Sequence, residues 1–321
     1  MHPTCSAPRG PVGRLAPSPT GALHLGNIRT FMVAWLQIRA AGGTVRLRIE
    51  DLDHPRHKAG ADTALIDDLR WLGFDWDGPV TYQSPRTEVY LSALDRLGDA
   101  LYPCYCSRAD IQGAQSAPHP GEVLRYPGFC RAKPHAGAWA AWRNGTLEVP
   151  EGRIPAWRLA LTEEDDGRFT DAFAGEQNHR AAELTGDFVV ARANAAAYAL
   201  AVVLDDAEMG ITHVVRGDDI LPATPAQVVL YQRLGLQLPT FWHLPLVVGP
   251  DHLRLAKRHG DTRISAYRAA GLPPERILSA LARSCGWLNP GESVPNLQAL
   301  LPRFSLETIP HEPLVWSDEL L

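Results

Sequence analysis

The segment from Arg14 to Asn27 joins a turn rich in proline and glycine to a histidine at the expected start of a helix. The free backbone N–H groups and the positive dipole end of a helix N-terminus favour phosphate binding. His24 can donate a hydrogen bond to phosphate oxygens, and Gly26 leaves room for a nucleotide ring against the helix. The segment predicts a nucleotide site, and an ordinary strand-turn-helix connection with a surface histidine is the alternative.

Three cysteines stand close together in a stretch rich in proline, glycine and histidine, at Cys104, Cys106 and Cys130. Three thiolates and one further donor fit tetrahedral zinc, and a metal would stabilise an excursion too small to bury a core of its own. The spacing leaves the fourth donor open among Tyr126, His119 and His135. Three free thiols are the alternative.

Alternating strands and helices must position these residues. Val12–Ala16 is a predicted strand, and the apolar residues of Leu25–Ile38 recur at helical spacing up to the stop at Gly42-Gly43. Val45–Ile49 alternates apolar and charged residues as a strand does, and it ends at the acidic residues of Glu50-Asp51. The first part of the chain therefore predicts a strand-helix-strand unit.

The same alternation extends along the chain, with one interruption. Helices are expected at 61–72 and 87–100, and an antiparallel strand is expected at 157–161 inside an insertion. A strand-helix-strand unit follows at 188–192, 198–204 and 212–216, and then a helix that begins with a capping box of Thr224 and Gln227. A strand at 241–248, a polar loop at 249–262 and mostly helical residues complete the chain. This order predicts an α/β fold, with a parallel sheet interrupted by an insertion and finished by helices. Ligands of such sheets bind at the carboxyl ends of the strands, which places Ala16–Gly21, Glu50-Asp51 and Arg216–Asp219 around one crevice.

Composition and charge exclude several classes of protein. A net charge of −5 gives no general attraction to a polyanion, although a local RNA site needs only a local group of arginines. The longest apolar run, Ala195–Leu204, is far shorter than the roughly 20 residues of a membrane-spanning helix. The first residues lack the apolar region of a secretory signal, so we expect the cytoplasm. An odd number of cysteines argues against a disulfide framework and leaves Cys5 and Cys285 without partners.

Four motifs, in the right order, resemble those of the class I glutamyl-tRNA and glutaminyl-tRNA synthetases. They are Arg14–Asn27 with a His-Ile-Gly-His type element at His24-Leu25-Gly26-Asn27, Leu47–Asp53, Tyr198–Asp206, and Arg216-Gly217-Asp218-Asp219. The resemblance implies a Rossmann-type parallel sheet with a zinc-containing insertion and a short C-terminal helical part. It also implies ATP, bound with Mg²⁺, as a substrate.

The resemblance assigns residues to ATP. These are His24, Gly26, Asn27 and Lys257, of which His24 and Lys257 would be catalytic. Lys257 stands at the second lysine of a Lys-Met-Ser-Lys-Ser type loop, here Arg254–Arg258, where Ala256 and Arg258 depart from the motif and change its hydrogen bonding. A solvated basic loop is the alternative reading of this stretch.

Glutamate, the amino acid that the resemblance implies, carries one ammonium and two carboxylates. Its pocket needs an anion for the ammonium and cations for the side-chain carboxylate. Glu50 is the expected partner of the ammonium, and Arg14 and Arg216 would clamp the carboxylate with help from the phenol of Tyr198. By resemblance, the backbone of Arg14, Leu15, Ala16, Pro17 and Ser18 also lines this pocket. A structural ion pair between Glu50 and Arg216 is the alternative.

The family's short members place a tyrosine four residues before the last cysteine, so the resemblance selects Tyr126 over His119 and His135 as the fourth zinc ligand. The expected division of the chain is a first half of the catalytic domain at 1–103, an inserted zinc-binding, acceptor-type subdomain at 104–186, a second half at 187–250, and the ATP loop with a C-terminal helical subdomain at 251–321.

Residues 259–321 after the loop can make only a few helices, whereas full glutamyl-tRNA synthetases continue into a large anticodon-binding domain. This compactness resembles the family's short branch, which activates glutamate without tRNA. The branch attaches glutamate to the queuosine base in the anticodon stem-loop of tRNA(Asp). Two alternatives remain, namely a truncated glutamyl-tRNA synthetase that charges the tRNA 3′ end and a non-catalytic paralogue that binds RNA or an amino acid.

Overall fold

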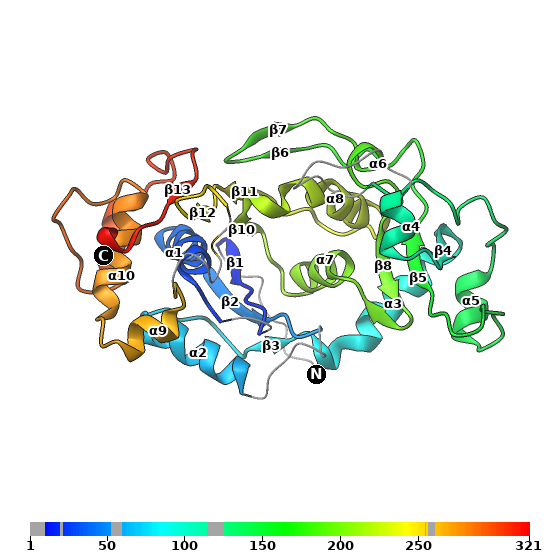
Figure 1. The fold of residues 1–321 in the computed structure, drawn as a ribbon, viewed down its shortest axis with the longest axis horizontal. Coiled ribbons are helices and arrows are strands. Elements are labelled where there is room, and N and C mark those ends of the chain that lie inside the picture. Colours follow the sequence, from blue (N-terminus) through cyan, green and yellow to red (C-terminus); the bar gives the residue numbers. More distant parts are fainter. Residues whose placement is uncertain (1–9, 20–21, 53–59, 114–124, 254, 256–260) are drawn as a thin grey trace.

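The computed structural model describes residues 10–19, 22–52, 60–113, 125–253, 255 and 261–321, and its centre is a five-stranded parallel sheet (Figure 1). The strands are β1 (Val12–Leu15), β2 (Thr44–Ile49), β3 (Thr81–Tyr82), β10 (His213–Gly217) and β11 (Thr240–Leu244). Their order, β11-β10-β1-β2-β3, runs outward from β1 on both sides, as in a doubly wound sheet. The predicted parallel α/β sheet is confirmed.

Helices connect and cover the strands of this sheet. They are α1 (Leu25–Ala40), α2 (Ala61–Trp71), α3 (Thr87–Leu97), α7 (Tyr198–Glu208) and α8 (Thr224–Arg233). All four residues of β1 are buried, and α1 buries Ile28, Met32 and Trp35 at helical spacing. The order of strands reverses between β1 and β10, so the crevice beside this point is where a doubly wound sheet binds its ligand.

The predicted stop of α1 uses its two glycines for different reasons. Gly42 has a φ of +66°, a conformation that L-residues with a Cβ rarely adopt. A Cβ on Gly43 would stand 2.2 Å from the carbonyl oxygen of Pro11. The first glycine therefore lets the chain turn, and the second lets β2 start directly beside the segment before β1.

A second, antiparallel sheet lies at one end of the molecule (Figure 1). It consists of β4 (Leu101–Cys104), β5 (Ala156–Leu159), β8 (Val189–Arg192) and β9 (Ala195–Ala196), and the same region contains the hairpin of β6 (Phe169–Asp171) and β7 (Gly175–Gln177) with α4 (Arg108–Gly113), α5 (Ala138–Arg143) and α6 (Ala181–Leu184). The antiparallel strand expected at 157–161 is confirmed in β5.

The strand expected at 188–192 departs from the predicted parallel alternation. It forms β8, which pairs antiparallel with β5 rather than joining the parallel sheet. A short apolar strand shows the same periodicity in either kind of pairing, so its neighbour could not be read from the pattern. The predicted subdomain boundaries stay predictions.

The last part of the chain is less helical than expected. It holds β12 (Val247–Val248), α9 (Ile264–Ala269), α10 (Pro274–Ser284) and β13 (Leu314–Val315), and β12 pairs parallel with β13. After Ser284 the helical segments are short 3₁₀ turns at Gln298–Arg303 and Asp318–Leu320. The single strand expected at 241–248 is also divided, since Pro245 has no N–H for a ladder and its carbonyl accepts a hydrogen bond from Arg29.

Two large apolar clusters make up the core. One surrounds α1, β2 and α10, and the other surrounds α3, β5, α7 and α8. Within the described residues, no helix is long and apolar enough to cross a membrane.

Candidate active site

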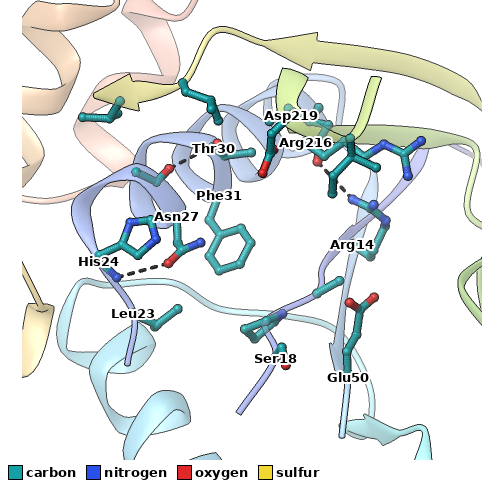
Figure 2. Close-up of a pocket in the computed structure, with 18 of the residues that line it drawn as sticks. Arg14, Ser18, Leu23, His24, Asn27, Thr30, Phe31, Glu50, Arg216 and Asp219 are labelled. Atoms are coloured by element: carbon teal, nitrogen blue, oxygen red, sulfur yellow. Dashed lines mark hydrogen bonds between the residues drawn. The ribbon is translucent and has the colours of Figure 1, made fainter. Parts of the chain in front are cut away.

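A cavity of about 370 Å³ opens at the carboxyl ends of β1 and β10, where the strand order reverses. Arg14 and Glu50 lie on one side of it, and His24 and Asn27 at the start of α1 lie on the other (Figure 2). The cavity also receives Arg216 from the end of β10. The crevice predicted from the strand ends is therefore present, with charged groups at one side and a helix N-terminus at the other. Of the acidic pair at the end of β2, Asp51 does not line it and instead accepts hydrogen bonds from Gln83 and Ser84.

The buried cation Arg216 is held by neutral groups. Its Nε–H donates to His243 Nε2 at 2.9 Å, and its Nη2 donates to Thr224 Oγ1 at 2.8 Å and to Gln227 Oε1 at 2.7 Å. Nη1 is buried and has no hydrogen-bond partner. Burial lowers the pKa of Arg216, and the charge of Arg14 adds to this effect. In the described part of the chain, no carboxylate lies within ion-pair distance of Arg216. Among the described residues, Arg216 thus presents a positive charge without a carboxylate in contact with it.

These contacts replace the capping box expected at Thr224 and Gln227, which was wrong. The residue before α8, Ala223, has helical dihedral angles, because a 3₁₀ turn at Asp218–Ala223 runs directly into the helix. Thr224 Oγ1 lies 3.2 Å from the carbonyl oxygen of Ile220, to which it can donate. Both side chains serve Arg216 instead of the helix N-terminus.

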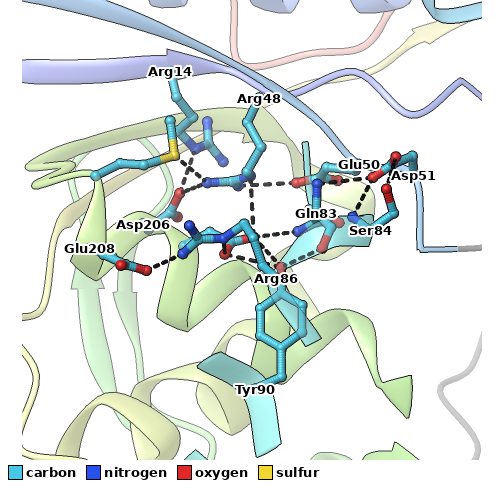
Figure 3. A network of polar contacts seen from close by, with 12 residues as sticks. Arg14, Arg48, Glu50, Asp51, Gln83, Ser84, Arg86, Tyr90, Asp206 and Glu208 are labelled. Atoms are coloured by element: carbon cyan, nitrogen blue, oxygen red, sulfur yellow. Dashed lines mark hydrogen bonds and ion pairs between the residues drawn. The ribbon is translucent and has the colours of Figure 1, made fainter. Parts of the chain in front are cut away.

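Arg14 and Glu50 belong to a buried ionic network with Arg48 and Asp206 (Figure 3). Arg48 donates to Glu50 Oε1 at 3.0 Å and to Asp206 Oδ1 at 2.6 Å. Arg14 Nε lies 3.4 Å from the same oxygen of Asp206, and its Nη1 donates to the Val215 carbonyl. The structural ion pair between Glu50 and Arg216 is absent among the described residues, because Glu50 pairs with Arg48.

Burial raises the pKa of Glu50, and the charge of Arg48 opposes this effect. A second cation beside Glu50 would stabilise its carboxylate further. The backbone N–H of Glu50 donates to the Pro17 carbonyl at 3.0 Å, so the turn after β1 and the end of β2 are fixed to each other.

The neighbouring carboxylate, Asp205, anchors the network to α3 and the turn before it. It accepts hydrogen bonds from Gln83, Arg86 and Tyr90, and its side chain is fully buried. The Tyr198–Asp206 motif therefore supplies α7, whose two adjacent carboxylates fix Arg14, Arg48 and Arg86.

The opposite side of the cavity is formed by the start of α1. His24 is the N-cap residue of α1, and its backbone N–H donates to Asn27 Oδ1 at 3.1 Å, as in a capping box. A Cβ on Gly26 would stand 3.0 Å from the His24 ring, so this glycine leaves room for that ring. The predicted nucleotide residues His24, Gly26 and Asn27 all line the cavity.

The other predicted residues divide into three groups. Ala16, Pro17, Ser18 and Tyr198 line the cavity, and Tyr198 is 44% exposed at the start of α7. Leu15 buries its side chain in the main core, so only its backbone is available to a ligand. Lys257 and its neighbours Arg254, Ala256 and Arg258 lie outside the described residues.

Sequence reasoning missed the residues that hold the charged groups in place. Arg48 and Asp206 stood in quoted motifs without a role, while Asp171 and His243 were not singled out. Arg48 could have been noticed as a charged residue between apolar residues of a buried strand, because a buried charge needs a partner of opposite charge. No sequence pattern around His243 indicates its contact with Arg216, because the two residues come together only when β10 pairs with β11.

The three cysteines of the insertion come together. The sulfur atoms of Cys104, Cys106 and Cys130 lie within 4.8 Å of one another, and those of Cys106 and Cys130 are 3.7 Å apart. Tetrahedral thiolates around zinc stand about 3.8 Å apart, from Zn–S bonds of about 2.3 Å. These cysteines can therefore bind a metal.

The phenol of Tyr126 lies beside these sulfurs, 3.5 Å from Cys104 Sγ and 3.9 Å from Cys106 Sγ. A tetrahedral site with one oxygen ligand has sulfur-oxygen separations of about 3.5 Å. His135 is outside this group of atoms and contacts the Tyr102 ring and the Lys133 carbonyl. His119 lies outside the described residues.

The fold and this arrangement of the cavity define a class I synthetase catalytic domain. Residues 12–303 match the family model of the class I tRNA synthetases for glutamate and glutamine (E and Q), catalytic domain. The chain belongs to this family. It is also similar to the solved structure of a glutamate-tRNA synthetase from Elizabethkingia anophelis, with a TM-score of 0.78 and 25% identity over 97% of this chain and 68% of the other.

Relatives matched along almost their whole length carry a more particular name. The glutamyl-Q tRNA(Asp) synthetase of Symbiobacterium thermophilum is 46% identical and is aligned over 94% of both chains. That of Rhodopirellula baltica is 42% identical over 96% of this chain and 97% of its own. A glutamate--tRNA ligase of Nitratidesulfovibrio vulgaris is 39% identical over 93% of this chain but only 62% of its own. Within the family, the chain therefore groups with the glutamyl-Q tRNA(Asp) synthetases.

Asp206 and Glu208 on α7 make a matched pair for testing the buried network. We expect Asp206→Asn to lower the free energy of unfolding by about 3–5 kcal/mol, since it removes the buried counter-charge that Arg14 and Arg48 share. Arg48 keeps its contact with Glu50, whereas Arg14 loses the carboxylate that it lies against. Glu208→Gln should cost less than about 1 kcal/mol, because Glu208 is 55% exposed where it pairs with Arg86. Urea denaturation of both variants measures the difference, and similar losses would contradict the assigned role of Asp206.

Proposed function

We propose that the chain activates glutamate with ATP in the absence of tRNA and transfers it to the queuosine base in the anticodon of tRNA(Asp). The single observation that carries the amino-acid part is the buried, unpartnered Nη1 of Arg216 in a cavity that Glu50 also lines. A cation without a neighbouring carboxylate favours an anionic ligand, whereas the amide of glutamine would leave the charge uncompensated.

In the proposed complex, Glu50 accepts the ammonium of glutamate, while Arg14 and Arg216 hold its side-chain carboxylate with the phenol of Tyr198 as an added donor. The backbone of residues 14–18 forms the floor. The internal partners of Arg14, Arg216 and Glu50 support activation without RNA, because these side chains are fixed by Asp206, His243 and Arg48.

ATP would lie toward the start of α1, on the side of the cavity that carries His24 (Figure 2). The α-carboxylate of glutamate attacks the α-phosphorus, the bond to the bridging oxygen breaks, and pyrophosphate leaves. His24, Lys257 and the positive dipole end of α1 stabilise the charge that develops on the phosphates. Mg²⁺ bound with the nucleotide would neutralise part of the phosphate charge.

The transfer step is supported by the relatives that align over nearly their whole length and are named glutamyl-Q tRNA(Asp) synthetase. In this step a hydroxyl of the queuosine base attacks the carbonyl of glutamyl-adenylate, and AMP leaves. A glutamyl-tRNA synthetase would instead use the hydroxyl of the 3′-terminal adenosine. The two proposals therefore differ in the RNA group that receives glutamate.

We expect glutamate-dependent exchange between ATP and pyrophosphate without RNA, with kcat/KM for glutamine lower by about 10²-fold or more because the charge of Arg216 would be left unpaired. Labelled glutamate should then enter tRNA(Asp) that carries queuosine, including tRNA lacking its 3′-terminal adenosine. Exchange only after RNA is added, or transfer that requires the 3′-terminal adenosine, would contradict the proposal.

We also propose that Cys104, Cys106, Cys130 and Tyr126 bind a structural Zn²⁺. The separations of the sulfur and phenol oxygen atoms fit tetrahedral zinc, as described above. The Tyr126 backbone is fixed by a hydrogen bond to the Thr185 carbonyl, so its phenol is held beside the thiols. When bound, the metal would stabilise the insertion by joining β4 to the segment of Tyr126 and Cys130.

Elemental analysis of protein purified without added metal should give one zinc per chain. Cys130→Ser should lose it, and Tyr126→Phe should weaken its binding because one ligand is removed. Cys285→Ser is the matched control, since Cys285 is a buried free cysteine in the other part of the molecule and should not affect zinc. If His119→Ala or His135→Ala abolished zinc binding while Tyr126→Phe did not change it, the fourth ligand would be wrong.

Lys257 tests the assignment of the ATP loop. Its ammonium should contact the phosphates more strongly as charge builds in the transition state, so Lys257→Ala should slow adenylate formation by about 10²- to 10³-fold with a smaller effect on glutamate binding. Single-turnover rates measure this step. Arg254→Ala should have the smaller effect, and a nearly unchanged rate in Lys257→Ala beside a severe loss in Arg254→Ala would require another alignment of the loop.

A further inference from the structure

Arg216 is supported by a buried histidine on the neighbouring strand, on the side of the guanidinium away from the cavity. Arg216 on β10 and His243 on β11 are paired in the parallel ladder, and Arg216 Nε–H donates to His243 Nε2 at 2.9 Å. His243 is 1% exposed, so water does not compete for this contact. Thr224 and Gln227 hold Nη2 of the guanidinium, and its Nε–H is held only if this ring nitrogen of His243 is unprotonated.

The other ring nitrogen of His243 contacts Asp171, which ends β6 at the turn toward β7. His243 Nδ1 and Asp171 Oδ2 are 2.5 Å apart, and both side chains are fully buried. The second oxygen, Asp171 Oδ1, accepts from the backbone N–H groups of Phe173, Ala174 and His243. The carboxylate is thus fixed in one orientation by the hairpin turn and by β11.

These contacts specify one tautomer of the histidine. A guanidinium has donors only, so His243 Nε2 must accept, and the ring proton must lie on Nδ1 and be donated to Asp171. Burial lowers the pKa of His243 to about 4, with the charge of Arg216 adding to the effect and Asp171 opposing it. The ring therefore stays neutral at physiological pH.

A neutral ring between Asp171 and Arg216 has an electrostatic consequence. If Asp171 contacted Arg216 directly, the buried ion pair would neutralise the guanidinium before a ligand arrived. Instead, His243, Thr224 and Gln227 each supply a neutral acceptor to Arg216, and Nη1 stays unpartnered. The guanidinium is oriented and keeps its charge.

We propose that Asp171 and His243 are positioning residues for amino-acid selection, in which Asp171 fixes the His243 tautomer that orients Arg216 toward an anionic side chain. This proposal rests on the proposed glutamate site. Neither residue contacts the ligand, because neither lines the cavity. Their effect reaches the substrate through Arg216.

Asp171→Asn is the sharpest test, because it changes the tautomer with little change of shape. The amide oxygen of asparagine would keep the three backbone donors, so its NH₂ group would face His243 Nδ1 and donate to it. The ring proton would then move to Nε2, where it meets the Nε–H of Arg216, donor against donor. We expect KM for glutamate to rise about 10- to 100-fold, with a smaller change in kcat and weaker discrimination against glutamine.

Two variants separate this role from a structural one. Asp165→Asn is the matched control, since Asp165 is another buried carboxylate of the insertion, which binds Arg233 and does not contact Arg216. It should leave the glutamate-to-glutamine ratio of kcat/KM unchanged. His243→Gln keeps an acceptor for Arg216 and should retain more discrimination than His243→Phe, which has none.

The tautomer itself can be measured without any substrate. ¹⁵N spectra of the imidazole rings, with His243 assigned by its loss in His243→Gln, should give a protonated Nδ1 in the unmodified protein and a protonated Nε2 in Asp171→Asn. A protonated Nε2 in the unmodified protein would overturn the proposal. So would Asp171→Asn that folds and keeps its discrimination within about twofold.

Failure of the proposed function would look different. Without glutamate-dependent exchange by the unmodified protein, the glutamate site would be wrong, and the selection role of Asp171 and His243 would fall with it. If instead only the role of Asp171 and His243 is wrong, the unmodified protein still shows glutamate-dependent exchange between ATP and pyrophosphate. The exchange assay on the unmodified protein therefore distinguishes the two cases.

Discussion

The buried carboxylate of Asp206 determines where the charged groups of the cavity can stand. It binds Arg48 and lies beside Arg14, and Arg48 in turn binds Glu50. Because buried charges must be paired, β1, β2 and α7 have to meet in one arrangement before any of these side chains is stabilised. The same contacts therefore fix the geometry of the site and stabilise the folded sheet.

The two arginines at the carboxyl ends of β1 and β10 are held in opposite ways. Arg14 lies against a carboxylate, so much of its charge is already compensated, whereas Arg216 has neutral acceptors only. Neutral side chains of the protein thus orient Arg216, and the compensation of its charge is left to a ligand. This division gives the cavity a fixed cation that gains a counter-charge only when an anionic ligand enters, which is the condition for electrostatic preorganisation.

The sequence predicted those features that local rules determine. Helical spacing in Leu25–Ile38, the glycine stop after it and the order of strands follow from periodicity and backbone freedom, and the structure has them. Thr224 and Gln227 show why the site was harder to predict. Their spacing matches a capping box, yet Arg216 offers stronger, charge-assisted hydrogen bonds to the same oxygen atoms. A rule based on neighbouring residues cannot take account of Arg216, because the fold alone brings this partner beside Thr224 and Gln227.

The insertion shows the same limit at a larger scale. Its composition indicated an excursion with its own metal site, which suggests a separate unit attached to the sheet. In the structure, its β6–β7 hairpin also lies against β11, where the Ala172 N–H donates to the Phe241 carbonyl and Asp171 reaches His243 (Figure 1). One end of the insertion thus carries the cysteine cluster, and its hairpin completes the support of Arg216. A change that displaced this hairpin would therefore act on the cavity through the neutral ring of His243, even though none of the insertion's described residues lines the cavity.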